Sequence, residues 1–114
     1  MCLFCKIINK EIPAEIVYED EEVLAFKDIQ PLAPVHILII SKKHFASMND
    51  FAEEDKKLVG HLLLTATKIA KDLKISENGY KLVIRTGEDG GQEVPHVHLH
   101  LIGGARLSEE IKPV

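Results

Sequence analysis

The chain has 114 residues, of which 46% are hydrophobic, and a formal net charge of −4 at pH 7. This length fits a single domain, residues 1–114, with enough apolar side chains for one core. The acidic balance disfavours binding to nucleic acids or membrane surfaces, because such binding needs a basic face. Any phosphate recognised by this chain must therefore be held locally.

The sequence shows no segment suited to a membrane or to export. The longest apolar run, residues 37–40, is too short to cross a bilayer, and Lys6 and Lys10 interrupt the pattern of a signal peptide. We therefore expect a cytoplasmic protein. Cys2 and Cys5 form a Cys-x-x-Cys pair, and structural disulfides are rare in the cytosol, so metal binding or redox chemistry is the natural interpretation. The absence of a predicted strand before this pair disfavours the redox motif.

The first half of the chain predicts a short helix followed by three strands. Residues 1–12 suit a short helical turn, and residues 16–18 and 23–26 predict a hairpin across an acidic turn, to which we assign no chemistry. Residues 35–41 are nearly continuously apolar and β-branched, as expected of a central strand buried on both faces. His36 interrupts this strand and fits either a buried structural histidine or a site residue.

The second half predicts one long amphipathic helix and two further strands. The helix is predicted to begin at Asp50, and its apolar residues recur at helical spacing to about Lys74. The apolar stripe is wider than one sheet contact needs, which indicates a second partner surface. Residues 80–86 predict the fourth strand, and residues 94–104 predict the last.

Three histidines stand in the last predicted strand, where they alternate with aliphatic residues. An extended backbone sends alternate side chains to opposite faces, so the imidazoles line one face and the aliphatic side chains are buried on the other. Zinc–imidazole bonds are about 2.0–2.1 Å long, whereas residues four apart on a strand are roughly 13 Å apart. His96 and His100 therefore cannot ligate the same ion, and at least one histidine has another role.

The first candidate site combines Cys2 and Cys5 with His44 and His96. Two thiolates and two imidazoles make a closed tetrahedral Zn²⁺ site, which contributes folding energy rather than reactivity. Such a structural zinc would attach the N-terminus to the sheet. The alternative is a pair of reduced cysteines without a ligand near a flexible terminus.

The second candidate site contains His98 and His100, which follow a glycine-rich turn. A neutral imidazole is a good nucleophile toward phosphorus near pH 7. Attack builds charge on the phosphoryl oxygens, so the backbone NH groups of Gly91 and Gln92 are candidate donors. His100 would donate to a phosphate oxygen, and His36 from the neighbouring strand would orient it or relay protons.

These residues together resemble the histidine triad (HIT) superfamily, in particular its Hint-type nucleotide-binding branch. The resemblance covers nearly the whole chain and rests on residues 4–8, 12–14, 25–29, 34–36, 42–44 and 90–101. The last segment, in which histidines alternate with apolar residues after Gly-Gly-Gln, is the most specific.

The resemblance implies an α+β fold in which an antiparallel sheet is joined by one long amphipathic helix and a short N-terminal helix. It implies a homodimer formed through the long helix and a sheet edge. It also implies hydrolysis of purine nucleoside 5′-phosphoramidates or related nucleotidyl compounds through a nucleotidyl-histidine intermediate on His98, supported by His100 and His36. Zinc-binding members use the pattern seen in Cys2, Cys5, His44 and His96.

The resemblance further implies which residues surround a purine nucleotide such as AMP, GMP or a phosphoramidate. Side chains around the purine would be Phe4, Ile7 and Leu38. The ribose would lie against Asp28 and Ile29. The residues expected around the phosphate are Arg85, Gly91, Gln92, Glu93, His98 and His100.

The sequence departs from the Hint pattern in two places. Arg85 stands where this branch usually has Asn, and it could add a charged donor for an anionic leaving group or form a salt bridge with Glu93 or Asp89. Residues 105–114 lack the Trp-Pro-Pro-Gly ending of many Hint proteins.

Three other functions remain open from the sequence. They are a non-catalytic nucleotide-binding or scaffolding dimer, a dinucleoside polyphosphate hydrolase, and a metalloenzyme built on the His-x-His pair. The metalloenzyme is disfavoured, because the strand offers no carboxylate ligand among its histidines.

Overall fold

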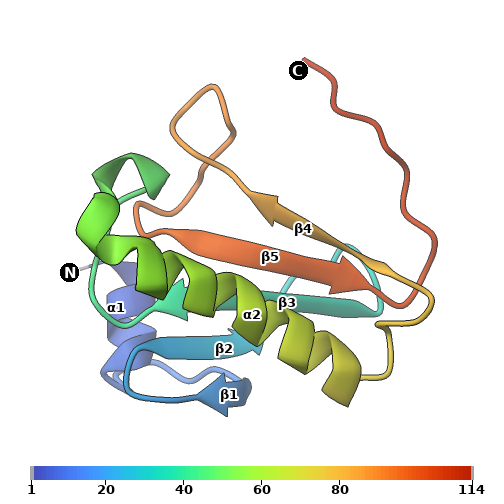
Figure 1. The fold of residues 1–114 in the computed structure, drawn as a ribbon, viewed down its shortest axis with the longest axis horizontal. Coiled ribbons are helices and arrows are strands. Elements are labelled where there is room, and N and C mark those ends of the chain that lie inside the picture. Colours follow the sequence, from blue (N-terminus) through green and yellow to red (C-terminus); the bar gives the residue numbers. More distant parts are fainter. Residues whose placement is uncertain (1, 114) are drawn as a thin grey trace.

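The computed structural model describes residues 2–113 as an α+β fold built on one five-stranded antiparallel sheet (Figure 1). The strands are β1 (Ile16–Glu19), β2 (Val23–Lys27), β3 (Val35–Ser41), β4 (Tyr80–Ile84) and β5 (His98–Gly103). The helices are α1 (Leu3–Ile8) and α2 (Lys56–Asp72), and two 3₁₀ turns, Met48–Asp50 and Glu53–Asp55, precede α2. The strands lie in the order β1-β2-β3-β5-β4. The predicted fold class is confirmed.

The central strand β3 divides the core into two clusters. Ile37 and Ile39 face α2, which crosses one face of the sheet in Figure 1, whereas Leu38 and Ile40 pack with Phe4 of α1 on the other face. Complete burial of each such side chain contributes about 1.5–3 kcal/mol. As the apolar run predicts, β3 is buried on both sides. The face that carries α1 is also the face on which the histidines gather.

The long helix begins later than its sequence pattern predicts. The predicted start at Asp50 is wrong, because the chain makes two 3₁₀ turns there and α2 begins at Lys56. The Asp50 carboxylate accepts the NH of Ala46 at 2.9 Å, and the Asp55 carboxylate accepts the NH of Ala52 at 2.9 Å. Aspartate side chains compete in this way for local backbone donors.

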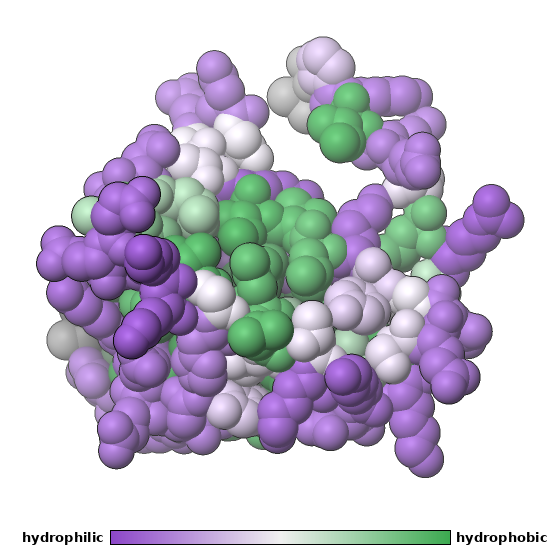
Figure 2. Space-filling view, in the orientation of Figure 1, coloured by the Kyte–Doolittle hydropathy of each residue, from purple (hydrophilic) through white to green (hydrophobic). Residues whose placement is uncertain are grey.

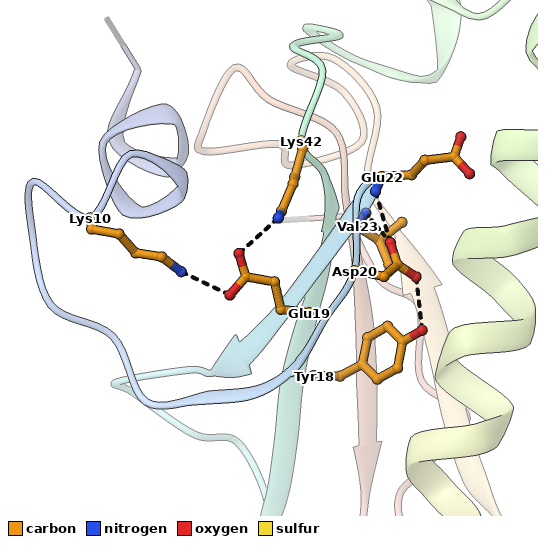
Figure 3. Close-up of polar contacts among 7 residues, drawn as sticks. All are labelled: Lys10, Tyr18, Glu19, Asp20, Glu22, Val23 and Lys42. Atoms are coloured by element: carbon orange, nitrogen blue, oxygen red, sulfur yellow. Dashed lines mark hydrogen bonds and ion pairs between the residues drawn. The ribbon is translucent and has the colours of Figure 1, made fainter.

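The turn between β1 and β2 is organised around one carboxylate. Asp20 accepts hydrogen bonds from the Tyr18 hydroxyl at 2.8 Å and from the NH groups of Glu22 and Val23 at 2.8 and 2.9 Å (Figure 3). His61 of α2 lies 2.7 Å from the same carboxylate and ties the turn to the helix. Burial alone would raise the pKa of Asp20, but these hydrogen bonds outweigh it and leave the pKa well below its ordinary value.

Glu19 joins three segments beside that turn. Its carboxylate pairs with Lys42 at 2.7 Å and with Lys10 at 2.9 Å (Figure 3), and these hydrogen bonds lower its pKa, the bond from Lys42 most strongly. Partly exposed ion pairs contribute about 0–1 kcal/mol each. Glu19 and Asp20 therefore tie the turn between β1 and β2 to the neighbouring segments.

An apolar area is exposed on the face of the molecule that carries α2 (Figure 2). Leu63 and Leu64 of this helix are 40% and 68% exposed, and β4 is an edge strand of the sheet. Residues 105–113 extend away from the sheet (Figure 1). Within the described chain, neither helix combines the length and the apolar composition that crossing a bilayer requires.

Candidate functional site

The three histidines of the last predicted strand belong to two neighbouring clusters. His98 and His100 alternate with core residues along β5, opposite Ile40 and Leu38 of β3. His96 lies two residues before β5, so the predicted alternation holds within the strand for the later two histidines. All three are buried. The backbone ahead of the strand turns His96 toward the N-terminus.

Four ligand atoms form a near-regular tetrahedron at the N-terminus. The six distances among the Cys2 and Cys5 sulfurs and the Nδ1 atoms of His44 and His96 lie between 3.0 and 3.6 Å. A zinc tetrahedron with bonds of about 2.0–2.3 Å has edges of roughly 3.3–3.8 Å. The four residues that the sequence predicted as zinc ligands thus lie together in a geometry that fits the ion.

Hydrogen bonding also prepares these atoms for a cation. The His96 Nε2–H donates to the Ser41 carbonyl at 2.7 Å, so in neutral His96 the Nδ1 lone pair points into the cluster. Burial lowers the pKa of His96, which keeps this ring neutral. Burial and the adjacent Cys2 raise the pKa of the Cys5 thiol, so a cation would offset the cost of ionising both sulfurs.

A chain of hydrogen bonds determines the tautomers of the second cluster. The Leu32 NH donates to His36 Nδ1 at 3.1 Å, so neutral His36 carries its proton on Nε2. That Nε2 lies 2.9 Å from His100 Nδ1 and 3.4 Å from an Asp28 carboxylate oxygen. His36 therefore donates to His100, and neutral His100 carries its own proton on Nε2.

His98, the candidate nucleophile, carries its proton on the other ring nitrogen, Nδ1. The His98 Nδ1 lies 2.8 Å from the His96 carbonyl, which can only accept, so Nδ1 carries the proton. The Nε2 of neutral His98 therefore keeps its lone pair. Phe4 packs edge-on against this ring, with 5.1 Å between the ring centroids, and limits its rotation. The orientation suits attack on an electrophile in the adjoining cavity.

Burial keeps two supporting rings neutral. It is the main reason that the pKa of His100 falls to about 4, and the nearby His98, Arg85 and His36 add to the effect. Burial likewise lowers the pKa of His36, against the opposing influence of the Asp28 carboxylate. At pH 7 both rings are therefore neutral, and His100 offers an N–H donor instead of a positive charge.

These side chains open onto a cavity of about 610 Å³, within the range typical of small-molecule sites. Nearly all of the residues that the sequence predicted around a nucleotide line this cavity: Phe4, Ile7, Asp28, Ile29, Leu38, Arg85, Gly91, Glu93, His98 and His100. His36 lines it as well. In this lining the apolar side chains of α1 and β3 lie next to the imidazoles, with Phe4 against His98 and Leu38 opposite His100.

Gln92, which the sequence predicted near the phosphate, does not line this cavity. Its side chain accepts the NH of Gly87 at 2.9 Å and donates to the carbonyls of Ala46 and Val94 at 2.6 and 2.9 Å. Gln92 therefore shapes the glycine-rich loop. The backbone NH groups expected to face a phosphate, those of Gly91 and Gln92, donate to loop carbonyls at 3.0 Å each.

Arg85 directly follows β4 and lies between His100 and Gly91 of the glycine-rich loop. Its Nη1 lies 3.3 Å from His100 Nε2, and Gly91, at a φ of +77°, passes close to its side chain. Within residues 2–113 no carboxylate lies within ion-pair distance of the guanidinium, so the expected alternative of a salt bridge to Glu93 or Asp89 is not formed. The positive charge remains available to a ligand.

A metal ion held by His36 and His100 does not fit these tautomers. Asp28, His36 and His100 place ligand atoms near one another. However, the Leu32 NH occupies the Nδ1 lone pair of His36, so the Nε2 of that ring is protonated and cannot ligate. This geometry disfavours the metalloenzyme.

Sequence reasoning missed several residues that line the cavity, most of them apolar. They are Leu3, Ile12, Pro13, Ala14, Phe26, Lys27, Gln30, Leu32 and Val94. Leu32 matters through its backbone NH, which no side-chain pattern reveals. Leu3 comes from α1, and Ile12, Pro13 and Ala14 come from the loop after it, where periodicity predicts only core.

The chain is similar to known proteins of one family. A model of the HIT domain family matches residues 9–107. The purine nucleoside phosphoramidase of Escherichia coli strain K12 is 48% identical over 105 residues, covering 92% of this chain and 88% of its own length. A HIT family hydrolase structure from Legionella pneumophila Philadelphia 1 is 50% identical, with a TM-score of 0.94 and coverage of 96% of this chain and 97% of its own. A histidine triad protein from Clostridium difficile is 44% identical, with a TM-score of 0.93 and coverage of 96% of both chains.

Fold and site together define an α+β protein whose sheet presents a histidine-lined cavity to a small ligand. The chain belongs to the HIT domain family. The resemblance inferred from the sequence is confirmed at this level, and the assignment to the Hint-type branch stays a prediction.

The neutral state of His100 predicts a pH dependence of stability. Below pH 6.5 the unfolded chain binds a proton that folded His100, with a pKa of about 4, does not, so stability falls as the pH falls from about 6.5 to 4. The expected loss from this ring is on the order of 3 kcal/mol. Urea unfolding between pH 7 and 4.5 measures it.

The control is His100→Gln, whose side-chain oxygen still accepts from His36 but does not titrate. Its free energy of unfolding should fall less over the same pH range. An equal fall in both proteins would contradict the neutral, buried His100. Asp20, with its lowered pKa, acts only below its ordinary value near 3.8 and lies outside this window.

Proposed function

We propose that this chain is a nucleotide-binding hydrolase that cleaves purine nucleoside 5′-phosphoramidates or related nucleotidyl compounds through His98. The observation that carries the proposal is the orientation of this ring, because Nδ1–H is held by the His96 carbonyl and Nε2 keeps its lone pair beside the cavity. The E. coli relative, at 48% identity, is named a purine nucleoside phosphoramidase, which supports this substrate class.

The cavity accommodates the parts of such a substrate separately. Phe4, Ile7 and Leu38 offer an apolar surface for the base, and Asp28 and Ile29 border the ribose position. His100 and Arg85, which lie against each other in the cavity lining, would supply donors for the phosphate. The substrate's phosphorus would thus lie against His98.

The reaction proceeds in two displacements. The His98 Nε2 lone pair forms a bond to phosphorus, and the bond to the amine breaks with its electron pair leaving on nitrogen. Water then attacks phosphorus and the P–Nε2 bond breaks, which restores the imidazole. The departing amine takes up one proton from solvent in the first displacement, and in the second the water gives its hydroxyl to the nucleotide and returns one proton to solvent. His36 and His100 position the phosphate and do not change charge.

The decisive variant is His98→Ala. Removing the nucleophile should lower kcat for adenosine 5′-phosphoramidate by at least about 10³-fold, while AMP binding and the unfolding midpoint change little. His61→Ala is the matched control, because this histidine lies on α2 outside the cavity. Undiminished turnover in His98→Ala would falsify the proposal. Tight AMP binding without turnover in the wild type would instead indicate the non-catalytic scaffolding dimer.

We also propose that Cys2, Cys5, His44 and His96 hold a structural Zn²⁺ ion. The support is the near-regular tetrahedron of ligand atoms and the His96 lone pair directed into it. When bound, the ion would join α1 to the loops after β3 and before β5. It supplies folding energy and takes no part in the displacements.

Metal analysis of protein purified without added metal tests the zinc site. We expect about one zinc ion per chain, and its loss in Cys2→Ser together with a fall of several kcal/mol in the free energy of unfolding. Ser108→Ala serves as the control, because this exposed serine lies outside the cluster of ligand atoms. Protein that carries no zinc and is equally stable after Cys2→Ser would contradict the site.

A homodimer is the third part of the proposal. Leu63 and Leu64 of α2 are exposed, and β4 is an edge strand of the sheet. Exposed apolar side chains and an edge strand are both suited to contact with a second copy of the chain. Sedimentation velocity at micromolar concentration should report a dimer, and Leu64→Glu should shift it to monomer. A wild-type monomer under these conditions would contradict the assembly.

A further inference from the structure

The two cysteine sulfurs are close enough to form a disulfide with little movement. The sulfurs of Cys2 and Cys5 lie 3.0 Å apart, and the Cys5 NH donates to the Cys2 sulfur at 3.2 Å. Cys2 directly precedes α1 with an extended backbone, and Cys5 lies in the first turn of that helix. A disulfide bond is about 2.05 Å long, so its formation closes a gap of roughly 1 Å.

The sulfurs are accessible to a small oxidant. Both cysteines are half-buried, and His44 beside them is exposed. The pair therefore lies at the surface end of the cluster, whereas His96 is buried beneath it. A molecule as small as hydrogen peroxide can reach the sulfurs from solvent.

Zinc binding and disulfide formation exclude each other at this pair. Zinc is ligated by thiolates at about 2.3 Å, so two sulfurs of a zinc tetrahedron lie roughly 3.8 Å apart. Oxidation removes both thiolate charges and brings the sulfurs to bonding distance. Only the imidazoles of His44 and His96 would then remain as ligands. Structural zinc sites use four ligands, so the oxidised chain should release the ion.

Phe4 links the cysteine pair to the cavity. It lies between the two cysteines in the chain, is 4% exposed, and packs against Phe26 and His98 with 5.5 and 5.1 Å between ring centroids. Phe4 lines the cavity together with Leu3 and Ile7 of the same helix. A helix of six residues, such as α1, does not persist without tertiary contacts. Loss of the zinc contacts should therefore loosen the side of the cavity that α1 supplies.

We propose that Cys2 and Cys5 form a redox-modification site through which a peroxide controls nucleotide binding. In the reduced state the thiolates hold zinc, and α1 lies against the cavity. In the oxidised state the disulfide expels the ion and releases α1 together with Phe4. The inference rests on the proposed function, because it uses the proposed zinc site and the proposed nucleotide cavity. The cysteines sense the oxidant and take no part in catalysis.

The oxidation balances with one molecule of hydrogen peroxide. One thiolate attacks a peroxide oxygen, the O–O bond breaks, and hydroxide leaves, which converts that cysteine to a sulfenic acid. The second thiolate attacks the same sulfur, the S–S bond forms, and the S–O bond breaks to release a second hydroxide. The two sulfurs together lose two electrons to the peroxide, and Zn²⁺ leaves with its charge unchanged. A dithiol reverses the reaction by exchange and is itself oxidised to a disulfide.

The test exposes the zinc-loaded protein to hydrogen peroxide. We expect the intact mass to fall by two hydrogen atoms and a colorimetric chelator to detect zinc release in the same proportion. Amide hydrogen exchange of residues 3–8 should accelerate at least about tenfold. Calorimetry should show the Kd for AMP rising at least about tenfold. Dithiothreitol with added zinc should reverse all four changes.

Two variants serve as controls. Met48→Leu removes the internal methionine, which peroxide also oxidises, and should respond as the wild type does. Cys5→Ser cannot form the intramolecular disulfide, so exchange of residues 3–8 should already be fast before peroxide is added. In this variant peroxide followed by dithiothreitol should produce no reversible change in AMP affinity.

Hydrogen exchange separates this inference from the proposed nucleotide site. If the wild type binds no AMP in either state, the nucleotide site fails, and the exchange of residues 3–8 alone decides the switch. Thiols that stay reduced and zinc that stays bound after peroxide would overturn the inference, as would protein purified without zinc. Zinc release that leaves either this exchange or an existing AMP affinity unchanged would overturn it as well.

Discussion

The backbone NH of Leu32 determines the protonation of the cavity, because an amide can donate a hydrogen bond but cannot accept one in its place. Its bond to His36 Nδ1 puts the His36 proton on the other nitrogen, and that proton in turn puts the His100 proton on Nε2. Burial keeps both rings neutral, so the arrangement persists at physiological pH. The loop that contains Leu32 has no recognisable sequence motif, yet it determines which ring nitrogens of the site donate hydrogen bonds and which accept them.

Much of the fold could be predicted from the sequence because its strongest patterns coincide with burial. The continuous apolar run of β3 and the alternation of His98 and His100 with core residues in β5 are both enforced by the pleat of the strand. The cluster of Cys2, Cys5, His44 and His96 could be predicted because thiolates and imidazoles are the side chains that zinc prefers, although these residues are far apart in the chain.

The remainder depends on contacts that no local pattern encodes. The helix α2 begins later than predicted because the carboxylates of Asp50 and Asp55 accept hydrogen bonds from backbone NH groups of the preceding segment. Asp20 and His61 are 41 residues apart in the chain and come into contact only because α2 packs across the sheet. No local sequence pattern therefore predicts this contact. The engagement of the loop NH groups likewise depends on the turn geometry around Gly91 and not on composition.

The backbone carbonyl of His96 connects two centres that are otherwise described separately. The side chain of this residue points toward the cysteines, while its carbonyl, one peptide from Val97, orients the imidazole of His98. A shift of the His96 backbone would therefore change both the position of Nδ1 in the tetrahedron and the carbonyl that accepts from His98 Nδ1. The proposed zinc site and the orientation of the His98 ring are therefore linked through two residues of main chain.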